Sequence, residues 1–332
     1  MTSDATIIIP AHNRRATTLA CLRRLARDGT FGWAHVIVVD DASTDGTAAA
    51  IAADFPQVEL LSGTGELWWT GAISLGMAVA LRHGPKYLYW LNDDCAPAPQ
   101  ALRRLCEVAA ERGAMTGGTC VLPGSDVVVY GGLRRRGFAF DLLPLRPGVI
   151  EPCDALSGNL VCLPAALAQE IGLPDARRLP HAIGDLDYAM RAAAAGWPVL
   201  VVHDAVAEAI PNTWDNHASW LLSDIPVADI WRNAWRKRSY GYFPTQWFFF
   251  TRHWGWRGAV QAIWLLAKRG PIMCVRLIVP QTWLRRTFGH RSQAWKEEQR
   301  LRAALASVSS TISPPAPPAA HGFSSPTGRE KD

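Results

Sequence analysis

The chain has 332 residues, of which 49% are hydrophobic and 19% are charged, and its formal net charge is only +5. This composition excludes a disordered chain and fits one large folded domain or two smaller ones. The seven cysteines form no CxxC pair and no Cys/His cluster. They suggest neither a disulfide framework nor a zinc site, and they favour a reducing compartment.

Short apolar runs alternate with helical patterns through the first two hundred residues. The first run starts almost at Met1 without a basic segment, so we expect no signal peptide. Continuous apolar strands separated by helices are typical of parallel strands buried on both faces, and we therefore predict an α/β doubly wound sheet. The predicted strands are 6–9, 34–41, 58–61, 87–91 and 198–206. The predicted helices are 16–27, 71–83, 165–171 and 184–197. A further helix, capped by Ser43 or Thr44, is predicted between the second and third strands.

Two carboxylate pairs, Asp40/Asp41 and Asp93/Asp94, follow predicted strands. Ligands of such sheets bind beyond the carboxyl ends of the strands. The pairs could bind a divalent cation that bridges to a phosphate, could form a phosphoacceptor site, or could simply cap helices and turns. The phosphoacceptor interpretation is weak because no downstream Lys is evident. The first turn reads PAHNRR rather than GxGxxG, which disfavours a nicotinamide-binding domain.

Residues 230–295 are basic and rich in tryptophan. They contain twelve Lys and Arg, eight Trp and no Asp or Glu. Trp with Arg favours a membrane interface, and the apolar pieces are too short to span a bilayer. The alternative is a helical subdomain or oligomer interface packed on the α/β domain. No nucleic-acid-binding motif accompanies the charge. The final segment, rich in Pro, Ser and Ala, is predicted to be disordered.

Five motifs in order resemble the family 2 glycosyltransferases of the GT-A fold. They are IIIPAHNR (7–14), VVDDASTDGT (38–47), GELWWTGAISLG (65–76), LNDD (91–94) and HAIGDLDYAMRAAAAGW (181–197). The third resembles the rhamnosyltransferase-like branch. The resemblance implies a GT-A domain, which we place at residues 1–225. The composition predicts a basic helical extension (226–305) and a disordered tail (306–332) after it. The resemblance also implies inverting transfer from a nucleotide-sugar, dTDP-rhamnose or otherwise a UDP-sugar, with Mg²⁺ or Mn²⁺.

The resemblance assigns roles to particular residues. The nucleotide and donor pocket would comprise Pro10, Ala11, His12, Asn13, Asp41, Trp68, Trp69, Gly71, Asn92 and Asp93. Asp41 would bond the pyrimidine, and Asp94 would bind the metal, with Asp93 near the ribose or the metal. We expect Trp68 and Trp69 to form a pocket wall in a loop. This chain has His12 where the family often has Tyr, and Ser74 where the branch commonly has Asn.

Asp185 falls at the general-base position, and Asp187 is the alternative base. Asp187 could instead pair with Arg191, four residues on along the helix. His203 is either a third metal ligand or a structural residue. Gly158 and Asn159 could face the acceptor, and Arg134, Arg135 and Arg136 could contact an anion or form a solvated loop.

The predicted acceptor is a glycan or lipid-linked glycan of cell-surface polysaccharide synthesis. We expect a cytoplasmic protein, peripheral on the inner face of the plasma membrane, with no nucleic-acid partner and with oligomer formation left open. Two other functions stay open. A nucleotidyltransferase would usually carry a Gly-rich, Lys/Arg-containing signature after the first strand, which PAHNRR lacks. An inactive scaffold is disfavoured by the intact Asp41, Asp94 and Asp185.

Overall fold

The computed structural model describes residues 4–211 and 220–311. A ten-stranded sheet has the order β10-β13-β6-β12-β4-β1-β2-β3, with β5 on β13 and β7 on β6, and a small second sheet has the order β11-β8-β9. The strands are β1 Ala5–Ala11, β2 Ala34–Asp40, β3 Glu59–Ser62, β4 Tyr87–Leu91, β5 Cys95–Pro97, β6 Met115–Val121, β7 Val128–Tyr130, β8 Gly132–Arg136, β9 Ala139–Leu142, β10 Ile150–Pro152, β11 Ala155–Leu156, β12 Leu160–Pro164 and β13 Val199–Ala209.

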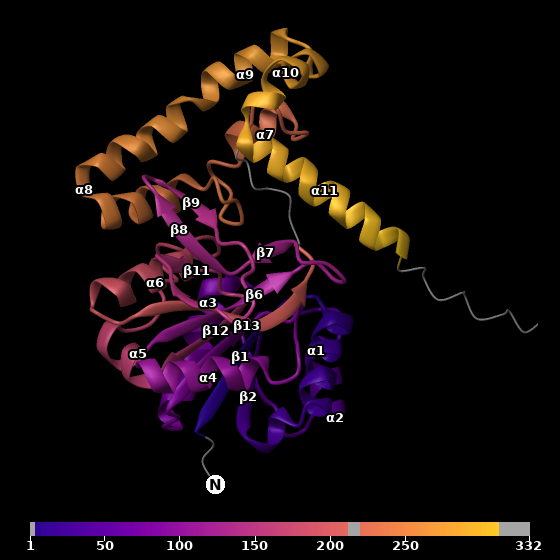
Figure 1. The fold of residues 1–332 in the computed structure, drawn as a ribbon, viewed down its shortest axis with the longest axis vertical. Helices are drawn as coiled ribbons and strands as arrows, with labels where there is room; N and C mark the ends of the chain where they lie inside the picture. Colours follow the sequence, from indigo (N-terminus) through magenta and orange to yellow (C-terminus); the bar gives the residue numbers. More distant parts are fainter. Residues whose placement is uncertain (1–3, 212–219, 312–332) are drawn as a thin grey trace, which may run out of the picture.

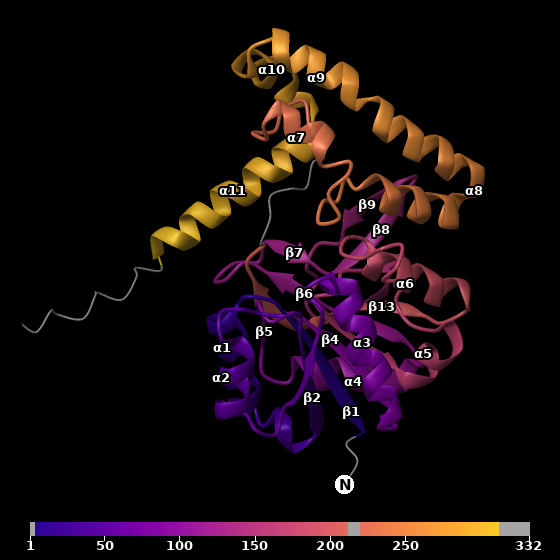
Figure 2. The same cartoon turned by 180° about the vertical axis from the view of Figure 1, so that it is seen from behind.

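Helices cover both faces of the large sheet (Figures 1 and 2). They are α1 Arg15–Arg27, α2 Thr47–Asp54, α3 Trp68–Arg82, α4 Ala101–Arg112, α5 Ala165–Ile171, α6 Gly184–Ala194, α7 Val227–Arg232, α8 Phe243–Ala267, α9 Arg269–Ile278, α10 Gln281–Phe288 and α11 Gln293–Thr311. Alternate residues of β1 point to opposite faces, so Ile7 and Ile9 pack with α1, α2 and α4, whereas Ile8 packs with α3, α5 and α6. The α/β architecture predicted from sequence is confirmed.

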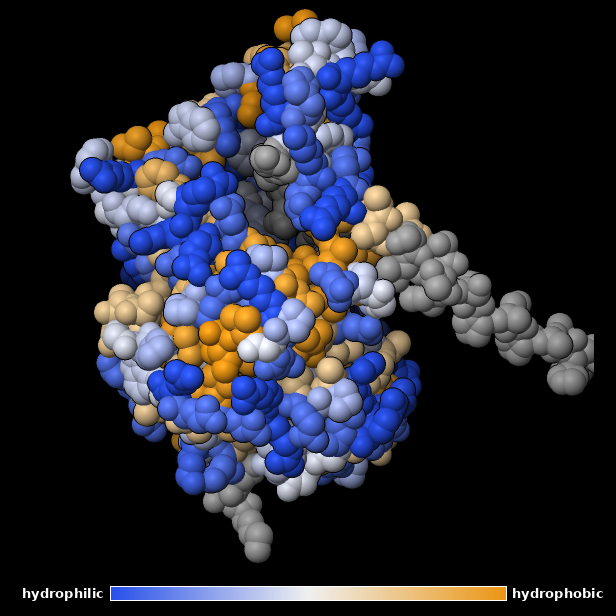
Figure 3. Space-filling view, in the orientation of Figure 1, coloured by the Kyte–Doolittle hydropathy of each residue, from blue (hydrophilic) through white to orange (hydrophobic). Residues whose placement is uncertain are grey.

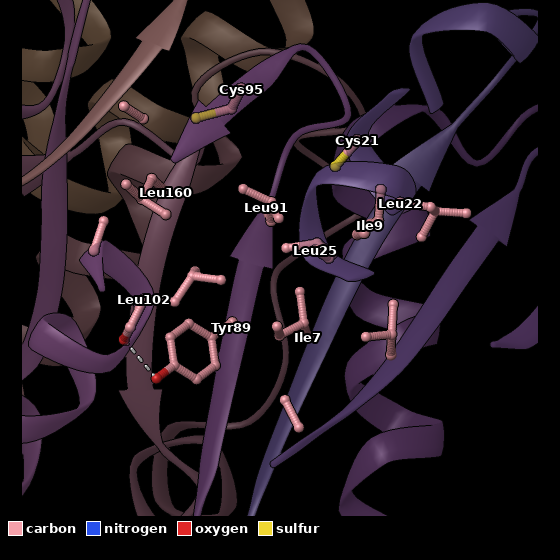
Figure 4. Close-up of a cluster of buried hydrophobic side chains, with 14 of the residues drawn as sticks. Ile7, Ile9, Cys21, Leu22, Leu25, Tyr89, Leu91, Cys95, Leu102 and Leu160 are labelled. Carbon is pink, nitrogen blue, oxygen red and sulfur yellow. Dashed lines mark hydrogen bonds between the residues drawn. The ribbon is translucent and has the colours of Figure 1, made fainter. Parts of the chain in front are cut away.

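The first of these cores shows how an apolar strand fits between helices. Figure 4 shows Ile7 of β1 and Tyr89 of β4 pointing toward the same layer as Leu22 and Leu25 of α1. All four side chains are almost completely buried. The Tyr89 hydroxyl donates to the carbonyl oxygen of Leu102 at 2.9 Å, so its one polar group is satisfied inside the core.

The direction of each strand determines which residues lie together at one edge of the sheet. β4, β1, β2 and β3 are parallel, and their carboxyl ends carry the two acidic pairs. β12 lies antiparallel between β4 and β6, so the residues that precede it meet the carboxyl end of β4. The sequence did not indicate this insertion. It brings Gly158 and Asn159 to the residues that follow β4, because Asn92 N–H donates to the Asn159 carbonyl at 3.0 Å.

The helices α7 to α11 follow the large sheet and stand to one side of it (Figure 1). α8 is two helices joined at Gly255, whose φ of 57° breaks the helical path. The two halves cross closely, since a Cβ on Gly258 would lie 1.9 Å from the Phe250 carbonyl oxygen. The first half packs on the hydrophobic core of the α/β domain through the buried Phe249 and Phe250. No helix in the described residues is long and apolar enough to cross a membrane.

Three element boundaries differ from the sequence predictions. α3 begins at Trp68, so the two tryptophans start a helix and do not lie in a loop. α2 begins at Thr47, and Asp45 rather than Ser43 or Thr44 accepts a hydrogen bond from the Thr47 N–H. α11 continues to Thr311, so the predicted disordered tail starts too early, and the rest of that prediction (312–332) lies outside the described residues.

Candidate functional site

The ends of β1 and β2 are tied together by polar side chains. His12 Nδ1 lies 2.6 Å from the carbonyl oxygen of Asp41. The backbone N–H of Asn13 donates to Ser43 Oγ at 2.7 Å, and the Thr44 N–H donates to Asn13 Oδ1 at 2.8 Å. Pro10 and Ala11 end the strand beneath these contacts. The predicted nucleotide-pocket residues of β1 therefore lie together, beside the first acidic pair.

Asp41 organises the loop that leads into α3. Its Oδ1 accepts a hydrogen bond from the Gly65 N–H at 2.6 Å, and its Oδ2 accepts bonds from Leu67 and Trp68 at 2.9 and 3.0 Å. A Cβ on Gly63 would lie 2.5 Å from Oδ1, so the backbone there requires glycine. In this structure the Asp41 charge is committed to the loop. Its contact with a pyrimidine base stays a prediction.

Trp68 and Trp69 contact different neighbours. The Trp68 ring lies edge-on to His181, with ring centres 5.7 Å apart. The Trp69 indole N–H donates to Asn92 Oδ1 at 2.7 Å, and its ring packs edge-on to Trp90. Gly71 is buried one turn further along α3. Trp69, rather than the pair, thus contacts the acidic motif after β4.

The carboxylates of Asp93 and Asp94 share one cation from the protein. Arg14 Nη1 lies 3.0 Å from Asp93 Oδ1, and Arg14 Nη2 lies 2.9 Å from Asp94 Oδ2. The Asp93 side chain is 2% exposed, and it also accepts a hydrogen bond from Thr18 at 2.8 Å. Burial raises the pKa of Asp93 to about 6, although Arg14 opposes the shift. The sequence did not single out Arg14, because its partners lie about eighty residues away.

Asp185 lies in the first turn of α6, where a helix N-terminus favours a negative charge. The backbone N–H of Gly158 donates to Asp185 Oδ2 at 2.7 Å, and the Leu186 N–H donates to Oδ1 at 2.9 Å. Burial raises the pKa of Asp185, and the two hydrogen bonds offset the shift only in part. The position before Asp185 requires glycine, because a Cβ on Gly184 would lie 2.3 Å from Thr70 Oγ1.

These contacts join the two acidic segments into one site. Asp185 is bonded to Gly158, and a Cβ on Gly158 would lie 2.3 Å from the Trp69 ring. Trp69 in turn donates to Asn92, next to Asp93. The buried Asn159 closes the circuit through its carbonyl contact with the Asn92 N–H. The structure therefore brings together predicted donor, metal, acceptor and base residues that are spread over more than ninety positions.

Comparison with known proteins shows which sequence family the first part of the chain resembles. Residues 6–153 match the family described as glycosyl transferase family 2. This part of the chain, somewhat less than half of its length, is therefore similar to that family. A polyprenol monophosphomannose synthase from Mycolicibacterium smegmatis is 28% identical over 130 residues, covering 38% of this chain and 48% of the synthase. The match thus spans about half the length of that relative.

Two solved structures share the fold of this chain. A mannosyltransferase from Pyrobaculum calidifontis, in complex with GDP-Man and Mn²⁺, has a TM-score of 0.52 at 16% identity, over 94% of this chain and 89% of that one. GalNAc-T7 with UDP, GalNAc and Mn²⁺ has a TM-score of 0.53 at 13% identity, over 80% of this chain and 55% of that one. These likenesses establish the fold, and the predicted GT-A class is confirmed.

Asp187 has a different environment from Asp185. Its side chain is completely buried and pairs with Arg191 at 3.0 Å, the helical pair considered in the sequence analysis. Arg252 and His253 of α8 also contact it, each at 2.9 Å. Burial alone would raise the pKa of Asp187, but the hydrogen bond from His253 and the charges of Arg252 and Arg191 together lower it. Asp187 therefore anchors α8 on α6, which leaves Asp185 as the better candidate base.

His203 lies within β13 rather than at its end. Its ring nitrogens lie 3.1 Å from Thr119 Oγ1 and 3.2 Å from Glu151 Oε1. Both nitrogens are thus engaged by protein groups, which favours the structural role over the ligand role.

The three consecutive arginines of β8 have separate surroundings. Arg134 lies 3.6 Å from Glu151, and Arg136 pairs with Asp141 at 2.7 Å. Arg135 lies over the Trp254 ring and lines a pocket with Gly137, Phe138, His253, Trp254 and Arg257. This pocket lies between the β8–β9 hairpin and α8, and it carries basic and aromatic side chains. Of the three, Arg135 is the best placed to meet an anionic ligand.

Proposed function

We propose that this chain is a metal-dependent, inverting glycosyltransferase. It would move a sugar from a nucleotide-sugar donor to a hydroxyl of a glycan or lipid-linked glycan. The observation that carries the proposal is a series of contacts that joins Asp185 to the Asp93/Asp94 pair. Gly158 N–H donates to Asp185, the Trp69 ring packs against Gly158, and the Trp69 indole N–H donates to Asn92 beside Asp93. The Asp93/Asp94 pair would serve the diphosphate of the donor, and Asp185 would serve as the base of the same reaction.

Asp185 would act as the general base. The attacking hydroxyl must lose its proton as the new glycosidic bond forms, and a carboxylate whose pKa lies nearer to neutrality is a better acceptor for that proton. Burial raises the pKa of Asp185 in this direction. One base on the acceptor side supports direct displacement, so the sugar is inverted and no covalent sugar–protein intermediate is needed.

The Asp93/Asp94 pair has the donor chemistry that Mg²⁺ or Mn²⁺ prefers, because both ligating groups are carboxylates. The pair also already holds a positive group, the Arg14 guanidinium. We assign Asp94 as the main ligand, since the more deeply buried Asp93 is also committed to Thr18. Such an ion would supply Lewis-acid stabilisation of the departing diphosphate. The two related structures named above contain Mn²⁺.

The donor sugar and nucleotide are proposals at a finer level. The segment from Gly65 to Gly76 favours dTDP-rhamnose, and UDP-sugars are the alternative. GDP-mannose also merits a test as a donor, because the similar mannosyltransferase structure contains GDP-Man.

The extension supports a membrane-surface location on the cytoplasmic side. Trp256, Leu277 and Ile278 are 74%, 73% and 81% exposed, although they are large and apolar. Figure 3 shows orange apolar patches among blue polar residues along α8 and α9. Arg257 belongs to α8 and Arg276 to α9, and Lys268 lies between the two helices. Exposed aromatic and aliphatic groups beside cations suit a bilayer with anionic headgroups. A lipid-linked acceptor would then meet the site from the membrane.

A ligand screen tests the catalytic proposal. Thermal unfolding is measured with dTDP-, UDP- and GDP-sugars, each with and without Mn²⁺, for the full chain and for Asp94→Ala. We expect one nucleotide-sugar to raise the melting temperature only with Mn²⁺, and Asp94→Ala to lose that shift. An equal shift in Asp94→Ala would remove Asp94 from the metal site. No shift with any nucleotide would favour a non-catalytic role.

A further inference from the structure

Three potential metal ligands lie at the opposite end of the sheet from the catalytic site. His35 is the second residue of β2, Glu59 is the first residue of β3, and His83 follows the last residue of α3. Asp40 is five residues further along β2, roughly 16 Å away at about 3.3 Å per residue. The cluster is therefore separate from the Asp93/Asp94 pair and has no role in the mechanism proposed above.

The ligand atoms of these residues converge. Nε2 of His35 lies 2.7 Å from Glu59 Oε2, and Nε2 of His83 lies 3.0 Å from the same oxygen. One ligand atom from each of the three residues lies within 4.8 Å of the others. Two donor atoms bound to one tetrahedral ion at about 2.1 Å lie roughly 3.4 Å apart. Small side-chain movements are thus enough to place an ion between these atoms.

Rigid elements hold the three side chains in this arrangement. β2 and β3 are paired in parallel, with Ile37 opposite Glu59. α3 packs on the face of the same sheet, and the imidazole rings at 35 and 83 are edge-on with centres 5.5 Å apart. The side chains of the cluster are 29–49% exposed, so an ion can enter from solvent.

We propose that His35, Glu59 and His83 form a second metal site, selective for Zn²⁺ and similar ions such as Co²⁺. Two imidazole nitrogens and one carboxylate suit these borderline ions, whereas Mg²⁺ and Ca²⁺ prefer oxygen ligands. The fourth position is open to water. The cysteine pattern of the sequence did not suggest a zinc site, because this one contains no cysteine and its ligands lie far apart in the chain.

The site would cross-link the edge of the sheet. β3 is the last strand of the sheet, and it has only four residues, none of them fully buried. A shared ion would fasten β3 to β2 and to the end of α3. A ligand that binds only the folded chain stabilises it, so Zn²⁺ should raise resistance to unfolding without any sugar donor. The rival explanation is a metal-free cluster in which the two histidines simply bond Glu59.

Zn²⁺ and Mn²⁺ titrations of the full chain by calorimetry separate these explanations. We expect one Zn²⁺ site that is lost in His83→Ala and His35→Ala, with affinity reduced by more than the roughly 10–100-fold typical of outer-shell changes. Asp94→Ala and the exposed-histidine control His290→Ala should keep it. Co²⁺ should give a visible absorption band in the wild type and not in His83→Ala.

Two results would overturn the metal site. One is Zn²⁺ affinity that is unchanged in both His83→Ala and His35→Ala, which would place any bound zinc elsewhere. The other is an absence of Zn²⁺ binding to the wild type. His83→Gln provides a second variant that keeps a polar side chain, so loss of binding there cannot be ascribed to failed folding if its circular dichroism is unchanged. None of these outcomes depends on glycosyl transfer.

Discussion

The backbone N–H of Gly158 donates a hydrogen bond to Asp185, and the space above that glycine is filled by the ring of Trp69. A Cβ at position 158 would lie 2.3 Å from Trp69 Cζ2 and 3.1 Å from the Cβ of Asp185. Neither neighbour is the free end of a flexible side chain. Glycine is therefore required here so that the base and the tryptophan can both approach the same backbone segment.

Gly158→Ala should impair turnover more than it impairs folding. The methyl group forces Trp69 or Asp185 to shift, and a displacement of about 1 Å near reacting groups can cost roughly 100-fold in rate. The overpacking itself should cost about 1–3 kcal/mol in the free energy of unfolding. Nucleoside diphosphate release from the donor found by the ligand screen measures the rate. Gly32→Ala, where a Cβ meets open space, is the control, and wild-type turnover in Gly158→Ala would contradict the arrangement.

Asp185→Asn should keep donor binding and lose turnover by about 10²–10⁴-fold, the usual contribution of a general base. An amide cannot accept the acceptor proton, yet it nearly preserves the shape of the side chain. Because burial raises the pKa of Asp185, this carboxylate becomes protonated at a higher pH than an ordinary aspartate. Wild-type turnover should therefore already fall at pH values above the ordinary titration range of aspartate. The pH profile of kcat and the nucleotide affinity are measured together. If Asp185→Asn turns over normally, the base lies elsewhere.

Asp187→Asn should act mainly on stability. Removing one partner of a buried charge cluster costs roughly 3–5 kcal/mol in the free energy of unfolding. The pKa of Asp187 is lowered in the folded chain, so its stabilisation is present above the unfolded pKa of about 3.9 and disappears as the pH falls through the folded value. The difference between wild type and variant should thus be largest near neutral pH and shrink below about pH 4.

The matched control for this cluster is Asp141→Asn. Asp141 pairs with Arg136 on the surface, where both side chains are more than half exposed, so its loss should cost no more than about 1 kcal/mol. Chemical denaturation at several pH values measures both variants. A pH-independent difference for Asp187→Asn would contradict the ionic explanation. Loss of turnover without loss of stability would instead restore Asp187 as the base.

Arg14→Gln should increase the stabilisation that Mn²⁺ gives. In the wild type the guanidinium of Arg14 occupies both carboxylates, so an incoming ion competes with it. Without that competitor each tenfold gain in Mn²⁺ affinity is worth about 1.4 kcal/mol. Melting temperatures with and without Mn²⁺ measure the effect, and Arg136→Gln serves as a surface control. A smaller Mn²⁺ shift in Arg14→Gln would show that the arginine assists the ion.

The sequence predicts the local elements of this fold better than their long-range contacts. Strand 87–91 and helix 165–171 agree with the structure residue for residue, because continuous apolar runs and helical periodicity are local signals. The predicted start of α3, at residue 71, was wrong, because the helix begins at Trp68. Gly65 and Gly71 suggested a loop, but Asp41 holds the backbone N–H groups of Leu67 and Trp68 and thereby orders the entry to the helix.

The contacts that build the site depend on tertiary structure. Arg14 reaches Asp94 across eighty residues, and Arg252 reaches Asp187 across sixty-five. No spacing rule connects such pairs. The Asp187–Arg191 pair could be considered beforehand because four residues make one helical turn. The extension was left open between packing and membrane binding, and the structure shows packing for the first half of α8 and exposed apolar groups on the second half.

Those exposed groups predict vesicle binding. Changing Trp256, Leu277 and Ile278 together to serine should reduce binding to vesicles of phosphatidylglycerol and phosphatidylcholine, because burial of a large apolar side chain contributes about 1.5–3 kcal/mol. Wild-type binding should also weaken with salt, since the cations of α8 and α9 act over a Debye length of about 10 Å at 0.1 M. Co-sedimentation measures both effects. Leu142→Ser/Val149→Ser, which alters exposed apolar residues of the catalytic domain, should bind as the wild type does. Equal binding by the triple variant would show that α8 and α9 do not contact the membrane.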